Sequence, residues 1–166
     1  MRLNASLACA LVSGMLSAIV PAAPPTSPET RAEVISRIDA LEKKPYDPAA
    51  RDARGTVMTW LIDAPDVSVT ICSALLGDLD ELDQDGGELF ATQLPFSEAR
   101  FILENPSKAD DEFAVHVAGV EGMLRTYANM KATRPDLRIR HLEKLLKAQA
   151  AGKLDAFVKD AMEKCH

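Results

Sequence analysis

The sequence has none of the short motifs that mark common catalytic and nucleotide-binding sites. It contains no HExxH zinc motif, no Gly-rich dinucleotide fingerprint, no phosphate-binding loop and no glycine-flanked serine of the nucleophile-elbow type. It also lacks a CxxC pair, so a thiol–disulfide oxidoreductase is not indicated. Basic residues are in the minority, 19 against 25 acidic ones, for a net charge of −6. This balance argues against nucleic acid and anionic membrane surfaces as main partners.

No segment of the chain resembles a membrane-spanning helix, which needs roughly 20 consecutive apolar residues. The longest run of small and apolar residues, 7–20, follows the single cation Arg2 and ends in a proline and alanine cluster at residues 21–23. This order of charge, apolar run and small residues is the layout of a secretory signal peptide. We therefore expect residues 1–23 to be cleaved, and the mature chain to be periplasmic or secreted without a membrane partner.

Export would leave two of the three cysteines, Cys72 and Cys165, in the mature chain. Exported proteins meet an oxidising compartment, so the simplest prediction is one disulfide between these two residues. A bridge that spans about 90 residues stabilises a fold by about 4–5 kcal/mol in the loop-entropy model. Two free buried thiols, or an intermolecular bridge from Cys165, remain as alternatives.

The strongest structural signal is a helical pattern over residues 107–133. Its bulky apolar residues recur at steps of three and four and define one face: Phe113, Val117, Val120, Leu124 and Tyr127. A second face carries Gly119 and Gly122, and each interior glycine costs a helix about 1 kcal/mol relative to alanine. Two glycines on one face predict that a neighbouring backbone comes close there.

The remaining polar positions of this helix carry no pattern typical of catalysis. Ser107 is expected to cap the helix, and Glu121, Arg125 and Asn129 are expected to face solvent. An enzyme would have to combine His116 with Glu121 and Arg125. The helical angle points His116 and Glu121 well apart, so a non-catalytic protein is favoured, with no cofactor.

Five further stretches have helical patterns with start and stop signals. In residues 88–104 Pro95 is expected to interrupt the helix, and Ser97 to cap its second half. The other helices are expected over residues 27–44, 49–63, 136–151 and 153–164.

Residues 66–77 are ambiguous, since their apolar positions fit both the alternation of a strand and the spacing of a helix. No second strand signal lies nearby, so we expect a helix. The sequence thus predicts an all-α domain over residues 29–166, preceded by a flexible segment, 24–28. It should be a single compact bundle of about six or seven helices around the central helix 107–133, with one disulfide.

The most acidic stretch, residues 78–88, raises the possibility of a calcium loop. If Gly86 is the tight-turn glycine of an EF-hand, the first, third and fifth ligand positions fall on Glu81, Asp83 and Asp85. The twelfth position, however, is Thr92 instead of the bidentate glutamate that the loop requires. A solvated acidic linker is therefore favoured, and calcium or small-ligand binding is the alternative.

Four of the five phenylalanines lie between residues 90 and 113. Such a cluster belongs to the core by default, but an exposed part of it would form an apolar patch for a protein partner. The candidate patch residues are Phe90, Leu94, Phe96 and Phe101.

One further alternative is a helical-repeat module. Met123, Tyr127, Met130 and Pro135 are spaced like the second helix of a tetratricopeptide repeat, but the first-helix positions do not match and no second copy is present. With no catalytic constellation in the sequence, the favoured function is a non-catalytic, exported protein that binds a protein partner.

Overall fold

The computed structural model describes residues 24–77 and 88–165, and within them the chain is all α-helical. The six α-helices are α1 (Pro28–Lys43), α2 (Ala50–Asp63), α4 (Glu88–Glu104), α5 (Glu112–Thr133), α6 (Arg140–Ala150) and α7 (Leu154–Met162). Two short 3-10 turns are η1 (Ser73–Leu75) and η2 (Pro106–Lys108). The predicted all-α bundle is confirmed. The predicted signal peptide, residues 1–23, and most of the acidic stretch 78–88 lie outside the described residues.

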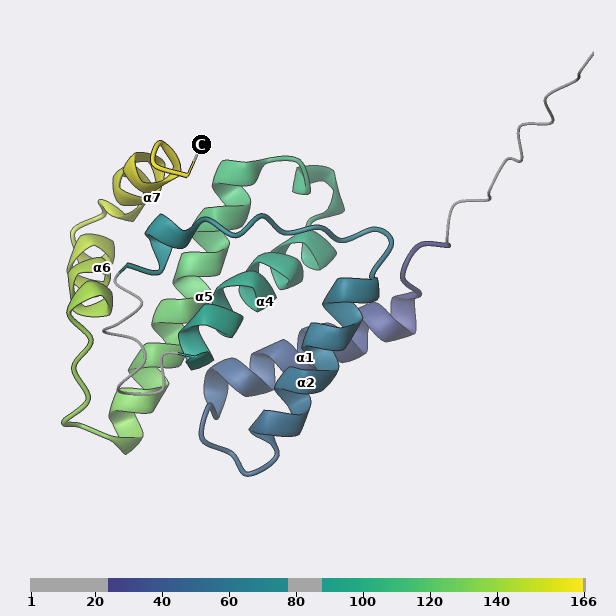
Figure 1. Ribbon diagram of the computed structural model, residues 1–166, viewed down its shortest axis with the longest axis horizontal. Coiled ribbons are helices and arrows are strands. Elements are labelled where there is room, and N and C mark those ends of the chain that lie inside the picture. Colours follow the sequence, from purple (N-terminus) through teal and green to yellow (C-terminus); the bar gives the residue numbers. More distant parts are fainter. Residues whose placement is uncertain (1–23, 78–87, 166) are drawn as a thin grey trace, which may run out of the picture.

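Helix α5 is the centre of the bundle, as the periodicity of its sequence predicts. It packs most extensively against α4, the helix that precedes it in the chain. Helix α1 contacts both α4 and α5, and α2 covers α1 and α4 (Figure 1). Helices α6 and α7 cover the opposite side of α5. The central pair is therefore enclosed from two sides.

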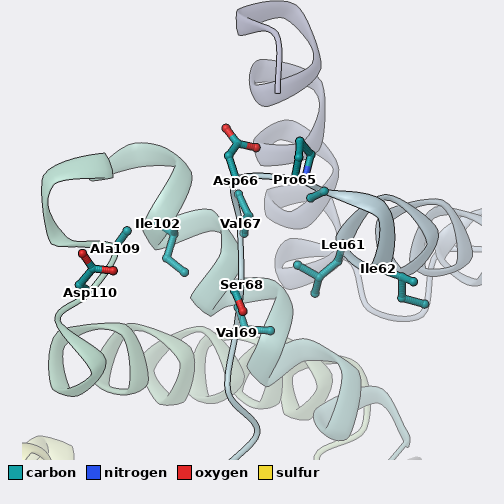
Figure 2. Close-up of a pocket in the computed structure, with 11 residues that line it drawn as sticks. Leu61, Ile62, Pro65, Asp66, Val67, Ser68, Val69, Ile102, Ala109 and Asp110 are labelled. Carbon is teal, nitrogen blue, oxygen red and sulfur yellow. The ribbon is translucent and has the colours of Figure 1, made fainter. Parts of the chain in front are cut away.

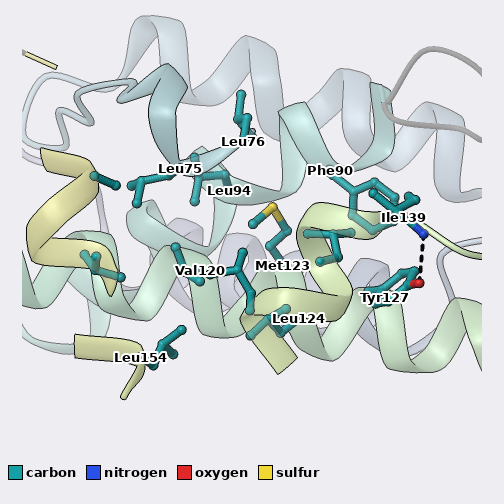
Figure 3. Packing of buried hydrophobic residues seen from close by; sticks show 14 of the residues in the cluster. Leu75, Leu76, Phe90, Leu94, Val120, Met123, Leu124, Tyr127, Ile139 and Leu154 are labelled. Atoms are coloured by element: carbon teal, nitrogen blue, oxygen red, sulfur yellow. Dashed lines mark hydrogen bonds between the residues drawn. The ribbon is translucent and has the colours of Figure 1, made fainter. Parts of the chain in front are cut away.

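The hydrophobic core has two parts. The larger part joins the first half of α4 to α5, α6 and α7, and Figure 3 shows its packing around Val120, Met123 and Leu124. Tyr127 lies in it fully buried, and its hydroxyl accepts a hydrogen bond of 3.1 Å from the Ile139 backbone N–H. The smaller part joins α1, α2 and the second half of α4.

The glycine face of α5 packs against α4, which confirms the predicted close approach of a neighbouring backbone. A Cβ atom placed on Gly122 would lie 2.0 Å from Ser97 Oγ and 2.4 Å from Ser97 Cβ. At Gly119 it would lie 2.6 Å from Glu98 Cγ. A Cβ atom at either position would overlap the side chain of Ser97 or Glu98 on α4. The two helices therefore reach this distance only with glycine at both sites.

The substitution Gly122→Ala is expected to lower the free energy of unfolding by about 1–3 kcal/mol, because the added methyl group forces α4 and α5 apart. Urea unfolding measures this change. The matched control is Gly55→Ala in α2, where an added Cβ meets nothing within 4 Å. The control should be stabilised by up to about 1 kcal/mol through helix propensity. A destabilisation of equal size in both variants would contradict the close packing of α5 on α4.

Three predicted helix boundaries are wrong. Pro95 lies inside a continuous α4, and Ser97 is buried in that helix instead of capping it. The cap of α5 is Asp111, whose side chain accepts from the Ala114 N–H, because Pro106 begins a separate 3-10 turn that contains Ser107. Helix α6 begins only at Arg140, since the residues before it form a loop that buries apolar side chains.

The expected helix over residues 66–77 is also wrong. Only the turn η1 is helical, and residues 66–71 run extended. The predicted disulfide is present: Cys72 is bonded to Cys165, with 5.5 Å between their Cα atoms. The bridge fastens η1 to the chain end that follows α7, and η1 and α7 are in contact.

Candidate partner-binding groove

The extended segment, residues 66–71, crosses one face of the bundle from the end of α2 to η1 (Figure 1). At its start, the Asp66 carboxylate forms an ion pair with Arg31 of α1. At its end, the chain enters η1 at Cys72, which the disulfide fixes. The segment is therefore held at both ends by different parts of the fold.

Alternating β-branched residues explain why this segment is extended. Val67 is buried and Val69 is partly buried, both against the smaller part of the core. Ser68 and Thr70 point to solvent. Ile71 departs from the alternation, because its side chain is 63% exposed. This alternation is visible in the sequence, and it is the signal there that indicates an extended conformation.

The backbone of the extended segment has no internal partner. Between Val67 and Ile71, no backbone N–H or C=O forms a hydrogen bond with another described residue. Also, no strand pairs with the segment within residues 24–77 and 88–165. Because backbone groups are strong donors and acceptors, such a segment offers a free edge to another extended chain.

A cavity of about 520 Å³ lies along the first half of the segment (Figure 2). In Figure 2 the segment passes between Leu61 and Ile62 of α2 on one side and Ile102 of α4 on the other. The side chain of Ile62 is 75% exposed. Single exposed apolar side chains are common on protein surfaces, so Ile62 matters here only because it lines this cavity.

A second cavity, of about 450 Å³, continues along the other half of the segment. It shares Ser68, Ala109 and Asp110 with the first cavity, so the two form one groove. Its acidic lining comes from the start of α5: Asp110, Asp111 and Glu112. No lysine or arginine lines either cavity. Acidic residues thus gather at one end of the groove, whereas the other end mixes apolar side chains with Asp66, Ser68 and Asp110.

His116 forms part of the floor of the acidic end. Its Nδ1 atom lies 2.7 Å from Oε1 of Glu98, a fully buried residue of α4. When the carboxylate accepts from the Nδ1–H, the other ring nitrogen, Nε2, is left as an acceptor. The second carboxylate oxygen of Glu98 is buried without a hydrogen bond. Burial raises the pKa of Glu98, and the hydrogen bond and charge of His116 only partly offset this.

A separate polar cluster holds α1, α4 and α5 together, and the sequence did not reveal it. Its centre is Glu42, whose side chain is 5% exposed and accepts from Arg125 Nε at 2.8 Å and from Ser97 Oγ at 2.9 Å. Arg100 Nη1 lies 3.2 Å from the same carboxylate. Asn129 donates to the Glu42 backbone carbonyl at 2.9 Å. The cluster is internal to the bundle, so its evident role is structural.

The contacts of this cluster also bear on the catalytic alternative, which would combine His116, Glu121 and Arg125. Arg125 contacts α1 and Glu42, whereas His116 pairs with Glu98. Glu121 pairs loosely with Arg125 along α5, at 3.9 Å. The three residues are therefore not gathered in one site. Arg125 is exposed as expected, although its guanidinium also reaches Glu42 of α1. Asn129 is only partly exposed, because its side chain donates to the Glu42 backbone carbonyl.

The candidate apolar patch is part of the core. Phe90, Leu94 and Phe96 are completely buried, and Phe101 is partly buried against the smaller part of the core. The hypothesis that these four residues form an exposed apolar patch is therefore wrong. The calcium candidates fall outside the described residues: Glu81, Asp83 and Asp85.

A third cavity, of about 530 Å³, lies between Phe113 and α7. It is lined by residues at the helix ends, Phe113 at the start of α5 and the others on α7 and its C-cap, and no extended segment of the described chain runs along it. Elsewhere in the described part of the chain, no group of three or more His, Cys, Asp or Glu side chains is placed to hold a metal ion. Across the same residues, no helix has both the length and the apolar character of a membrane span.

The groove therefore combines three features at one place: an extended segment without backbone partners among the described residues, the exposed Ile62, and an acidic end with no lysine or arginine in its lining. Comparisons with protein-family models, curated proteins and solved structures found no match to this chain. Its function must accordingly be argued from the groove.

Proposed function

We propose that this chain is an exported, non-catalytic protein that binds a protein partner along the extended segment 66–71. The observation that carries the proposal is the unpaired backbone from Val67 to Ile71, flanked by a groove. Extended peptides bind by adding a strand to such an edge, and their main-chain hydrogen bonds supply much of the affinity. The exposed side chain of Ile62 would supply an apolar contact in the groove, and the exposed Ile71 one at the end of the segment.

Export is supported by two features of the chain. The first 23 residues have the layout of a signal peptide. The Cys72–Cys165 disulfide suits an oxidising compartment, where such bonds persist. The mass of the protein recovered outside the cytoplasm tests this part: a chain that begins at residue 23 or 24 supports it, and an uncleaved chain contradicts it.

Site-specific photocrosslinking tests the partner site. A benzophenone amino acid is placed at Thr70, which is exposed on the segment, and for comparison at Thr133, which is exposed at the far end of α5. Both variants are expressed in the cells that make the protein, and the products are separated after illumination. We expect a discrete adduct from position 70 that is absent from position 133.

The adduct partner is then identified by mass spectrometry, purified and titrated against the wild-type protein. Saturable binding that an added benzophenone at position 70 weakens would support the proposal. Identical products from both positions, or no adduct from position 70, would overturn it.

A further inference from the structure

We infer that the occupant of the groove is an extended, cationic peptide segment of the partner, bound as an added strand with a basic side chain in the acidic end. This inference rests on the proposed function and names the chemistry of the partner.

The extended backbone sets the conformation of the occupant. A free edge with both N–H and C=O groups unpaired is complemented by another chain in the β conformation, because only that conformation presents donors and acceptors at the same spacing. A helical partner satisfies its own backbone internally and would leave the groups from Val67 to Ile71 unpaired. The occupant is therefore extended.

The two cavities set the spacing of its side chains. In an extended chain, residues i and i+2 point to the same side and lie about 6–7 Å apart. The first cavity has aliphatic side chains in part of its lining, among them Ile62 and Ile102, and there it accepts an aliphatic side chain. The acidic cavity adjoins it through Ser68 and Asp110, so a second side chain two to four residues along the occupant reaches it.

The charges of the acidic cavity set the identity of that second side chain. Asp111 is occupied as the cap of α5, but Asp110 and Glu112 are exposed and form no hydrogen bond or ion pair with another described residue. The floor contributes His116, whose Nδ1 lies 2.7 Å from Glu98 Oε1. The carboxylates of Asp110 and Glu112 complement a group that carries only donors, such as the lysine ammonium or the arginine guanidinium.

The same features disfavour the other occupants. A second copy of this chain would place its own acidic cavity and its net charge of −6 against those of the first copy. Like charges across an interface are unfavourable. An acidic peptide would meet the same repulsion. A cationic strand is the occupant whose charge and backbone both match the groove.

The inference is tested by selecting octapeptides from a random displayed library on the mature, disulfide-bonded protein. We expect recovered peptides to share a lysine or arginine two to four residues from an aliphatic residue, without proline between them. A synthetic peptide of that consensus is then titrated by fluorescence anisotropy. N-methylation of two alternate backbone amides should weaken its binding more than about tenfold, because two main-chain hydrogen bonds are lost.

Two protein variants separate a local charge effect from a general one. Asp110→Asn combined with Glu112→Gln should weaken binding of the basic peptide about three- to tenfold, as expected for two partly solvated charges. The control, Asp155→Asn combined with Glu163→Gln, changes the net charge equally on α7 and should change the affinity less than twofold.

Acidic or patternless recovered peptides, indifference to N-methylation, or equal effects of the two double variants would overturn the inference. So would a crosslinked homodimer as the adduct from position 70, which would make a second copy the occupant. Suppose that position 70 gives an adduct with a different protein and that any of the first three results is also obtained. The proposed partner site is then kept, and only the cationic strand is rejected. Absence of that adduct rejects the proposed site itself.

Discussion

Replacing both Cys72 and Cys165 by alanine is expected to lower the free energy of unfolding by about 4–5 kcal/mol. The bridge joins residues 93 positions apart, and a closed loop of that length restricts the unfolded chain strongly in the loop-entropy model. A domain of this size has a total stability of about 5–15 kcal/mol. Loss of the bridge therefore removes a large part of the stability, and η1 and α7 lose their covalent connection.

Urea unfolding of the oxidised wild type, the reduced wild type and the double alanine variant measures this effect. The reduced wild type serves as the control for the alanine side chains, because it lacks the bridge but keeps both sulfur atoms. We expect reduction and substitution to give similar losses. A loss below about 1 kcal/mol in both would show that the bridge adds little constraint.

The second large effect is expected from Glu42→Ala, which should cost about 2–4 kcal/mol. Removing one partner of a buried ion pair leaves the others desolvated without compensation. Here the Arg100 side chain is 15% exposed and loses one carboxylate but keeps Asp39, 2.5 Å away, whereas buried Ser97 loses its acceptor. Arg125 is 43% exposed and regains water, which holds the expected cost below that of a fully buried pair.

The matched control is Glu33→Ala on the same helix. Glu33 pairs with Arg37 in the exposed i, i+4 arrangement, so its loss should cost less than about 0.5 kcal/mol. Thermal and urea unfolding of both variants provide the comparison. Equal losses would mean that the Glu42 cluster contributes no more than a surface pair.

The periodic part of the fold was predictable from the sequence. The stripe from Phe113 to Tyr127 predicted the central helix, and the paired glycines predicted the close approach that α4 makes. Two cysteines in a chain with a signal-like start predicted the disulfide. Each of these features is local or has few alternatives, which is why sequence patterns identify them.

The polar cluster was not predictable, because its members are ordinary in sequence. Glu42 stands next to two lysines near the end of α1 and is typical of a solvated helix terminus. Ser97 and Glu98 follow Pro95 and therefore resemble a helix start. The helix continues through Pro95 because its neighbours Leu94 and Phe96 are buried in the two parts of the core, and this packing outweighs the lost backbone hydrogen bond.

The groove was not predictable from the sequence for a related reason. The alternation of Val67 and Val69 was visible, but a strand without a partner was rejected in favour of a helix. The structure shows that packing holds the segment in place: its two valines pack against the smaller part of the core, and its backbone forms no hydrogen bond with another described residue. The expectation that extended segments pair in sheets fails here, because no pairing strand lies within residues 24–77 and 88–165.

The free edge is tested most directly by hydrogen–deuterium exchange of the amides from Val67 to Ile71, resolved by residue. In the free protein these amides should exchange rapidly although both ends of the segment are anchored, because none of them is hydrogen-bonded within the described chain. At a saturating concentration of the selected basic peptide, alternate amides of the segment should slow by more than about tenfold, while those of α5 remain unchanged. Slow exchange in the free protein, or no change on binding, would contradict a strand-accepting edge at residues 66–71.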